Sequence, residues 1–235
     1  MGQTNGTITR QRKTTAKKET QQRKTTQAAP KKTQPARQAQ QQKPAASTSR
    51  PKVSLNDIMR NMVYVEGGTF IMGATAEQKN PDYDETPTHR VSLSSFYIGK
   101  YEVTQALWKA VMGSNPSYWK GDNLPVETVS WNDCQTFLRK LNAMTGKNFR
   151  LPTEAEWEFS ARGGNRSRGY QYSGSNVLSD VAWYDDNSGM KTHNVGTKAP
   201  NALGIYDRSG NVWELCQYWH RYYYVYSQTN PTGPS

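Results

Sequence analysis

NALGIYDRSGNVWEL, residues 201–215, contains a Gly-Asn pair that is typical of a tight turn. An acid stands on each side of this turn, Asp207 before it and Glu214 after it, and apolar residues follow at once. Spacing alone favours a simple interpretation, in which Asp207 opens the turn and Glu214 makes a buried pair with an arginine. The alternative is a metal site, because two acids around a turn offer several oxygen ligands within eight residues.

Two helices are predicted upstream of this stretch from apolar spacing and capping residues. In residues 101–113 the apolar side chains fall on one helical face, Thr104 can cap the start, and Gly113 can end the helix. Residues 130–146 repeat this pattern with Ser130 as the cap. We expect these helices to contribute one apolar face each to a core.

A third, short helix is predicted in RLPTEAEWEFSARGG, residues 150–164. Thr153 and Glu156 have the spacing of a capping box, and Gly163 supplies a stop. Residues 165–204 then carry Gly, Asn, Ser and Asp between isolated aromatics, with little periodicity. Such a long irregular segment is uncommon in a compact domain, so a bound metal or packed aromatic side chains are expected to order it.

Strands are predicted nearer the N-terminus. Residues 53–62 suit a short lead-in helix, and residues 63–73 suit two short strands around a Gly67-Gly68 turn. Residues 74–88 are polar and are expected to form a loop. Residues 89–99 alternate enough to predict one further strand.

The positive charge of the chain is confined to its first fifth. The 235 residues carry a net charge of +11, yet residues 1–52 hold 13 Lys or Arg against one acid, and the rest holds 17 against 18. All 26 aromatic residues lie at or after Tyr64. Residues 1–52 cannot bury enough apolar area to offset the entropy of ordering, so we predict a disordered basic tail followed by one domain over residues 60–235.

The tail also predicts the kind of partner it would meet. Its flexible basic groups would contact nucleic acid, or an acidic membrane or protein surface, without sequence specificity. The simplest interpretation is a solubilising or tethering arm. No stretch approaches 18 apolar residues and no apolar signal segment is visible, so no transmembrane helix and a cytoplasmic location are expected.

Five consecutive motifs resemble signatures of the formylglycine-generating-enzyme, or sulfatase-modifying-factor, family. They occur in the family's order over roughly residues 63–233. The motifs are MVYVEGGTFIMG, DETPTHRVSLSSFYIGKYEVTQALW, LPVETVSWNDC, FRLPTEAEWEFSARGG and NALGIYDRSGNVWEL. The resemblance implies a single α+β domain with little regular secondary structure, related to C-type lectins.

The resemblance also implies oxygen-dependent chemistry. The best-known members oxidise a cysteine of a sulfatase to formylglycine with copper held by two cysteines, so a protein substrate such as a sulfatase is one expectation. Other proteins with this fold bind ligands or proteins without known chemistry, which is the alternative function. For this chain the choice between copper and iron stays open.

The two cysteines do not suit the copper site. Cys134 has helical spacing with Phe137, Leu138 and Leu141, which is a core position, and Cys216 directly follows the motif's Leu215. Family members continue through an RGGSW-like strand and a closing GFR strand, and their catalytic cysteine pair lies in that segment. We therefore expect a chain that lacks the C-terminal strands, either as a fragment or as an inactive shortened protein.

The resemblance further implies a structural calcium ion at YDRSGNVWE. Asp207 and Glu214 would supply carboxylate oxygens, and Gly210 and Val212 would supply backbone carbonyls. A second calcium site would fall in DVAWYDDNSGM. Its candidate ligands are Asp180, Asp185, Asp186 and Asn187, and a solvated acidic turn is the simpler interpretation.

Overall fold

The computed structural model describes residues 54–78, 85–218 and 225–233. These residues belong to one unit of the chain. The predicted disordered tail, residues 1–52, lies outside the described residues, so it stays a prediction. The predicted polar loop at 74–88 is described only in part. The described chain already forms a helix, α1 (Leu55–Arg60), ahead of the predicted domain start at residue 60.

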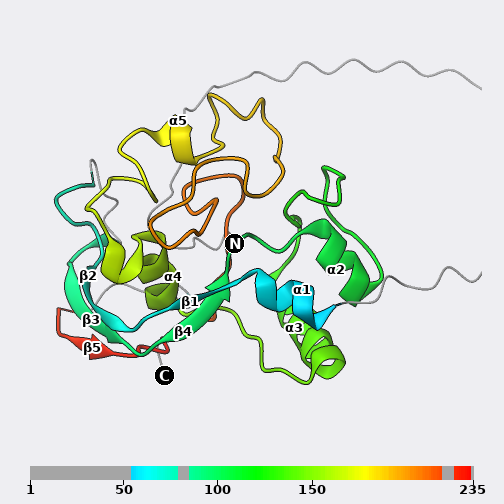
Figure 1. The fold of residues 1–235 in the computed structure, drawn as a ribbon, viewed down its shortest axis with the longest axis horizontal. Coiled ribbons are helices and arrows are strands. Elements are labelled where there is room, and N and C mark those ends of the chain that lie inside the picture. Colours follow the sequence, from blue (N-terminus) through cyan, green and yellow to red (C-terminus); the bar gives the residue numbers. More distant parts are fainter. Residues whose placement is uncertain (1–53, 79–84, 219–224, 234–235) are drawn as a thin grey trace, which may run out of the picture. The chain divides into compact units, whose positions relative to one another are not determined.

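A long bent hairpin forms the β part of the domain. Strand β1 (Met62–Val65) pairs antiparallel with β4 (Phe96–Gly99), and β2 (Gly68–Met72) pairs antiparallel with β3 (His89–Leu93). The register continues across both pairs, from Val65 opposite Phe96 to Gly68 opposite Leu93. Figure 1 shows β1 running on into β2, and β3 running on into β4.

The hairpin bends where Gly67 faces Ser94 and Ser95. The Gly67 N–H donates to the Ser95 Oγ, at 3.0 Å, in place of a ladder bond. A side chain at Gly67 would place its Cβ 2.4 Å from the Leu93 carbonyl oxygen, so only glycine fits. The two strands predicted at 63–73 are confirmed, but the predicted Gly67-Gly68 turn is wrong, because Gly68 already belongs to β2 and pairs with Leu93. The single strand predicted at 89–99 is wrong, because the chain leaves the ladder at Ser94-Ser95 and forms β3 and β4.

A last strand, β5 (Gln228–Thr229), lies parallel to β3. Asn230 fixes it there. The Asn230 N–H donates to the Ser92 carbonyl oxygen at 2.8 Å, and the Asn230 Oδ1 accepts from the Ser94 N–H at 2.7 Å. The segment after the motif region therefore returns to the hairpin.

Helices α2 (Gln105–Met112) and α3 (Trp131–Thr145) pack together and share an apolar cluster. Thr104 and Ser130 cap their starts and Gly113 ends α2, as predicted, and a second left-handed glycine, Gly146, ends α3. The rings of Trp108 and Phe137 stack with centroids 4.9 Å apart at the centre of the cluster.

Helix α4 (Glu154–Ala161) packs against β2 and β3 and is buried along its whole length. The predicted capping box of Thr153 and Glu156 is present. The helix ends at Ala161, and Gly163 leads into a 3-10 turn, η2 (Gly164–Arg166). Ala155 and Phe159 join the hairpin core with Ile205.

Two of the acids of α4 have basic partners. Glu156 accepts two hydrogen bonds from the Arg150 guanidinium, at 2.7 and 2.6 Å. The Glu158 Oε1 accepts from the Arg162 Nε and from the Gly73 N–H, both at 2.9 Å. Since a buried carboxylate is costly unless it is paired, these contacts explain how so acidic a helix is buried.

The segment from 165 to 204 is irregular, as predicted. Within the described residues, its one α-helix is the short α5 (Leu178–Val181). Side chains order the backbone here. The Asn201 Nδ2 donates to the Ser160 carbonyl oxygen at 2.8 Å, and the Asn201 Oδ1 accepts from the Leu203 and Ile205 N–H groups.

Of the helices in the described residues, none is long and apolar enough to cross a bilayer.

Candidate functional site

The Gly210-Asn211 turn lies against the segment at Trp183. The Asn211 N–H donates to the Trp183 carbonyl oxygen at 2.8 Å. A Cβ at Gly210 would lie 2.3 Å from the same oxygen, so the close approach requires glycine. Asn211 has a φ of 67°, a left-handed conformation that asparagine tolerates better than most residues.

Glu102, which sequence reasoning did not single out, holds this turn from the other side. Its side chain is buried, and it accepts from the Asn211 Nδ2 at 2.8 Å and from the Val212 N–H at 3.2 Å. Burial raises the pKa of Glu102 well above its usual value, and the nearby charges of Glu214 and Asp207 raise this pKa further. Glu102 lies in the quoted motif YEVTQALW, which is the one signal that could have found it.

Asp207 is buried and has a φ of 60°. Its Oδ2 accepts from the Gly196 N–H at 2.7 Å. Burial raises the pKa of Asp207 to about 6, although the Gly196 hydrogen bond opposes this rise. The structure thus brings three carboxylates, those of Glu102, Asp207 and Glu214, into one corner.

Arg208 supplies a positive charge to the corner. Its Nη1 donates to the Glu214 Oε2, and its Nη2 donates to the Gly99 carbonyl oxygen at 3.1 Å. The side chains of Arg208 and Glu214 are 4% and 19% exposed, so the ion pair is largely buried. The simpler interpretation of the sequence, a buried pair of Glu214 with an arginine, matches this contact.

The four residues expected to hold calcium lie in and around this turn. The carboxylates of Asp207 and Glu214 are of a type that calcium accepts, and Gly210 and Val212 lie between them in the turn. The Glu214 Oε2 already faces a guanidinium, and the Asp207 Oδ2 already accepts an N–H. As placed, the set does not fit an added calcium ion. Calcium binding here stays a prediction, which an experiment below tests.

The residues expected to form a second calcium site are spread out. Asp180, on α5, accepts from the Ser175 Oγ at 3.1 Å. The Asn187 side chain binds the local backbone at Tyr184 and Ala182, while Asp185 and Asp186 are exposed. Across the described ranges, no group of three or more His, Cys, Asp or Glu residues is placed to hold a metal ion. The second calcium site also stays a prediction.

The two cysteines lie in different apolar clusters. Cys134 packs with the α2 and α3 cluster, and Cys216 packs with Trp157 and Ala161. Burial raises the pKa of the Cys134 thiol to about 11, and it raises the pKa of Cys216 as well. Burial therefore disfavours both thiolates, and the thiolate is the form that binds copper.

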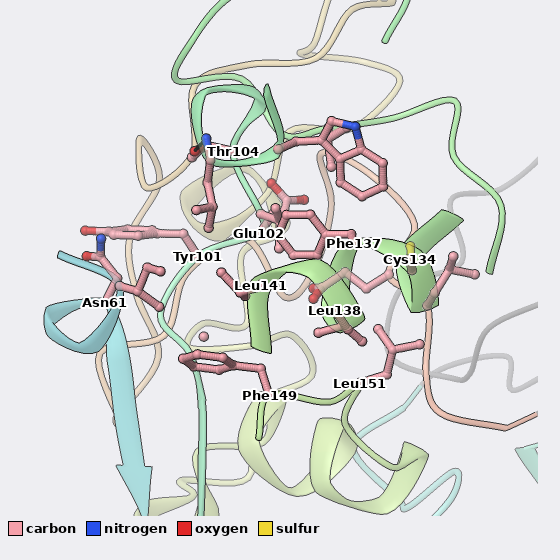
Figure 2. A pocket seen from close by; sticks show the side chains of 18 of the residues that line it. Asn61, Tyr101, Glu102, Thr104, Cys134, Phe137, Leu138, Leu141, Phe149 and Leu151 are labelled. Atoms are coloured by element: carbon pink, nitrogen blue, oxygen red, sulfur yellow. Dashed lines mark hydrogen bonds between the residues drawn. The ribbon is translucent and has the colours of Figure 1, made fainter. Parts of the chain in front are cut away.

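A cavity of about 1320 Å³ lies between α1, α2, α3 and the turn region. Figure 2 shows Phe137, Leu138 and Leu141 of α3 around it, together with Phe149 and Leu151 from the segment that follows. The Cys134 thiol lines it, and so do Glu102 and Arg208 of the corner. The wall is therefore largely apolar, and the charged groups of the corner are part of it.

Gln105 organises the loop that contributes Tyr118 and Trp119 to the lining of this cavity. It is fully buried, and its Nε2 donates to the carbonyl oxygens of Trp119 and Pro125, at 2.8 and 3.0 Å. Its Oε1 accepts from the Asn115 Nδ2 at 2.7 Å and from the Gly121 N–H at 3.1 Å. All four hydrogen-bonding positions of the amide are used, so the loop is held in one conformation.

The loop presents aromatic side chains at the edge of the cavity. Tyr118 is 75% exposed and meets Trp119 edge to face, and Trp213 of the motif is also exposed. Thr128, in the same lining, has a φ of 59°. Positive φ is strained for a β-branched residue, and such strain gathers at binding sites.

Comparison with known proteins assigns the family. Residues 47–233 match the pattern of the Sulfatase-modifying factor enzyme 1-like domain. The chaperone protein LppX of Paenibacillus barcinonensis is 38% identical over an alignment that covers 68% of this chain and 72% of LppX. The formylglycine-generating enzyme of Thermomonospora curvata is 30% identical, covering 72% of this chain and 75% of that enzyme.

Solved structures agree with the sequence matches. Treponema denticola variable protein 1 superposes with a TM-score of 0.66 at 33% identity, covering 74% of this chain and 78% of that one. PvdO from Pseudomonas aeruginosa gives a TM-score of 0.54 at 29% identity, covering 66% and 69%. The expected α+β sulfatase-modifying-factor fold is confirmed, and the chain belongs to the sulfatase-modifying factor enzyme 1-like family.

Proposed function

We propose that this chain is a binding module that holds an apolar segment of another polypeptide in the cavity beside α3. The observation that carries the proposal is the cavity wall. It is built from half-buried apolar side chains that a ligand would cover. Several of these half-buried apolar side chains belong to the cluster shared by α2 and α3. They are Ile58, Leu107, Val126, Val129, Leu138 and Phe149.

The size of the cavity supports a polypeptide ligand. Pockets for small molecules enclose roughly 300 to 1,000 Å³, and this one encloses about 1320 Å³. The exposed aromatics Tyr118 and Trp213 extend the surface beyond the mouth. Aromatic anchors beside an apolar pocket are typical of protein-binding sites.

A polar group in the lining suits a ligand that carries amide groups. The Thr192 Oγ is buried and has no hydrogen-bond partner within the described residues. A bound backbone could satisfy it, since buried polar atoms are normally paired. The name of the relative LppX, a chaperone protein, agrees with binding of a polypeptide segment.

Fluorescence anisotropy with a labelled, reduced and carboxymethylated protein that stays unfolded tests the proposal. The parent chain should bind this probe and should release the apolar dye ANS as it does so. Leu138→Lys places a charge in the cavity and should weaken binding at least tenfold, whereas Met144→Lys on the exposed side of α3 should not.

Cys134→Phe provides a second test that adds bulk without charge. It should weaken binding of the unfolded probe while circular dichroism reports a folded chain. Equal binding by the parent, Leu138→Lys and Cys134→Phe would rule out this cavity as the site.

A second candidate function is oxidation of a cysteine in a protein such as a sulfatase, which relatives named formylglycine-generating enzyme favour. The placement of the two cysteines in different apolar clusters argues for the binding module instead. Incubation with a cysteine-containing sulfatase peptide, copper and oxygen, followed by mass spectrometry, separates the two. Conversion to formylglycine would establish the oxidase.

A further inference from the structure

Arg208 lies at the junction of three parts of the domain. Its guanidinium carbon lies 5.8 Å from the centre of the Trp157 ring of α4. Its Nη2 reaches the Gly99 carbonyl oxygen at the end of β4. Its Nη1 binds the Glu214 carboxylate after the turn. One side chain thus connects the hairpin, the buried helix and the motif region.

The surroundings of Arg208 carry more negative than positive charge. Glu102 accepts from the Asn211 Nδ2 and the Val212 N–H, Asp207 accepts from the Gly196 N–H, and Glu214 accepts from Arg208. Three acids therefore share the corner with one guanidinium. A buried carboxylate is costly unless it is protonated or paired with a cation. Arg208 provides that cation for Glu214 through a direct ion pair.

The shape of arginine explains why it can serve here. A guanidinium is planar, stays charged, and offers several donors in fixed directions. One donor faces Glu214, another faces a backbone carbonyl, and the guanidinium carbon lies over an indole ring. A metal ion in this corner would collect carboxylate and carbonyl oxygens in a comparable way.

We infer that the Arg208 guanidinium is the structural cation of this corner and takes the place of the calcium ion that the family resemblance implies. The corner is therefore held without added metal. The inference does not depend on the ligand of the cavity, and it would stand if the proposed function failed.

Thermal unfolding of the full chain tests the inference. The Tm of the parent should stay within about 1 °C in EGTA and after addition of millimolar calcium, because no site is left to fill. Arg208→Met should lower the Tm by about 10 °C, because it leaves Glu214 buried without a counter-charge.

Two further variants make the result specific. Arg60→Met removes an exposed ion pair with Asp57 and should change the Tm by no more than about 2 °C. Arg208→Met combined with Glu214→Gln should lose less than the two single losses added together, because the two side chains act on each other.

Two outcomes would overturn the inference. One is a parent Tm that falls in EGTA and returns with calcium. The other is an Arg208→Met variant that is as stable as Arg60→Met. The comparison of the parent with and without chelator decides the matter even if Arg208→Met fails to fold.

Discussion

Within the described residues, the part from 54 to 162 and the part from 163 to 218 are stabilised in different ways. The first contains the capped helices and the bent hairpin, whose backbone groups bind one another in regular ladders. In the second, the side chains of Asn201, Asn211 and Ser173 bind backbone carbonyl oxygens that lie 12 to 41 residues away in the sequence. Regular structure thus spreads its stability over many similar bonds, whereas the irregular part concentrates it in a few residues.

Phe159→Ala should give the largest loss in the free energy of unfolding, and it tests the regular part of the domain. Phe159 is buried in the hairpin core, and its removal leaves a cavity. We expect a loss of about 4 kcal/mol in the free energy of unfolding. Urea unfolding measures it, with Tyr97→Ala, an exposed aromatic on β4, as the control that should lose far less.

Asn201→Ala should cost nearly as much, although only a small polar side chain is lost. It leaves the Leu203 and Ile205 N–H groups without the Asn201 Oδ1, and it removes one of the two donors to the Ser160 carbonyl oxygen. We expect a loss of about 3 kcal/mol, against almost none for the exposed Asn148→Ala. A loss below that of a typical surface substitution would contradict the contrast between the two parts.

Capping substitutions should have smaller effects of opposite sign in the two parts. Thr153→Ala removes the cap of α4 and should cost about 1 kcal/mol. Val177→Asp adds a cap to α5, which starts without a side-chain cap, and should gain up to about 1 kcal/mol. The same urea titrations measure both changes, and a loss with Val177→Asp would show that α5 does not behave as a helix start.

The smallest effect is expected from the pH dependence of Glu156. Burial alone would raise its pKa, but the Arg150 and Thr153 hydrogen bonds outweigh burial and lower it. A lowered pKa adds stability above the unfolded-state pKa of about 4.3, and this is lost as the pH falls through the folded-state value. Glu156→Gln should therefore reduce the fall in the free energy of unfolding between pH 5 and 3, by an amount that corresponds to about one bound proton or less. An unchanged fall in the free energy of unfolding would mean that other groups cause the acid sensitivity.

Much of the regular part could be predicted because its signals are local. Thr104, Ser130 and Thr153 cap helices that begin at the next residue. The strand predicted at 89–99 failed since its break depends on Gly67, which meets Ser95 across the hairpin. The roles of Glu102 and Gln105 could not be predicted from the sequence. Their hydrogen-bond partners lie in loops that come close to these side chains only when the chain is folded.

The candidate site was predicted in part for the same reason. The motif 201–215 predicts that Asp207 and Glu214 lie close together, and it includes an arginine as a possible partner of Glu214. The identity of that partner as Arg208, and the contact to Gly99, follow from packing between segments distant in sequence. The cavity could not be predicted, because it is formed by helices, loops and the turn together.

Hydrogen–deuterium exchange in the presence and absence of an unfolded, carboxymethylated protein tests the binding-module proposal most directly. The account predicts slower exchange on binding in α2, α3 and the loop that Gln105 holds, with no change in α5. Protection confined to the region around α5, or no protection at a saturating concentration of the probe, would contradict it.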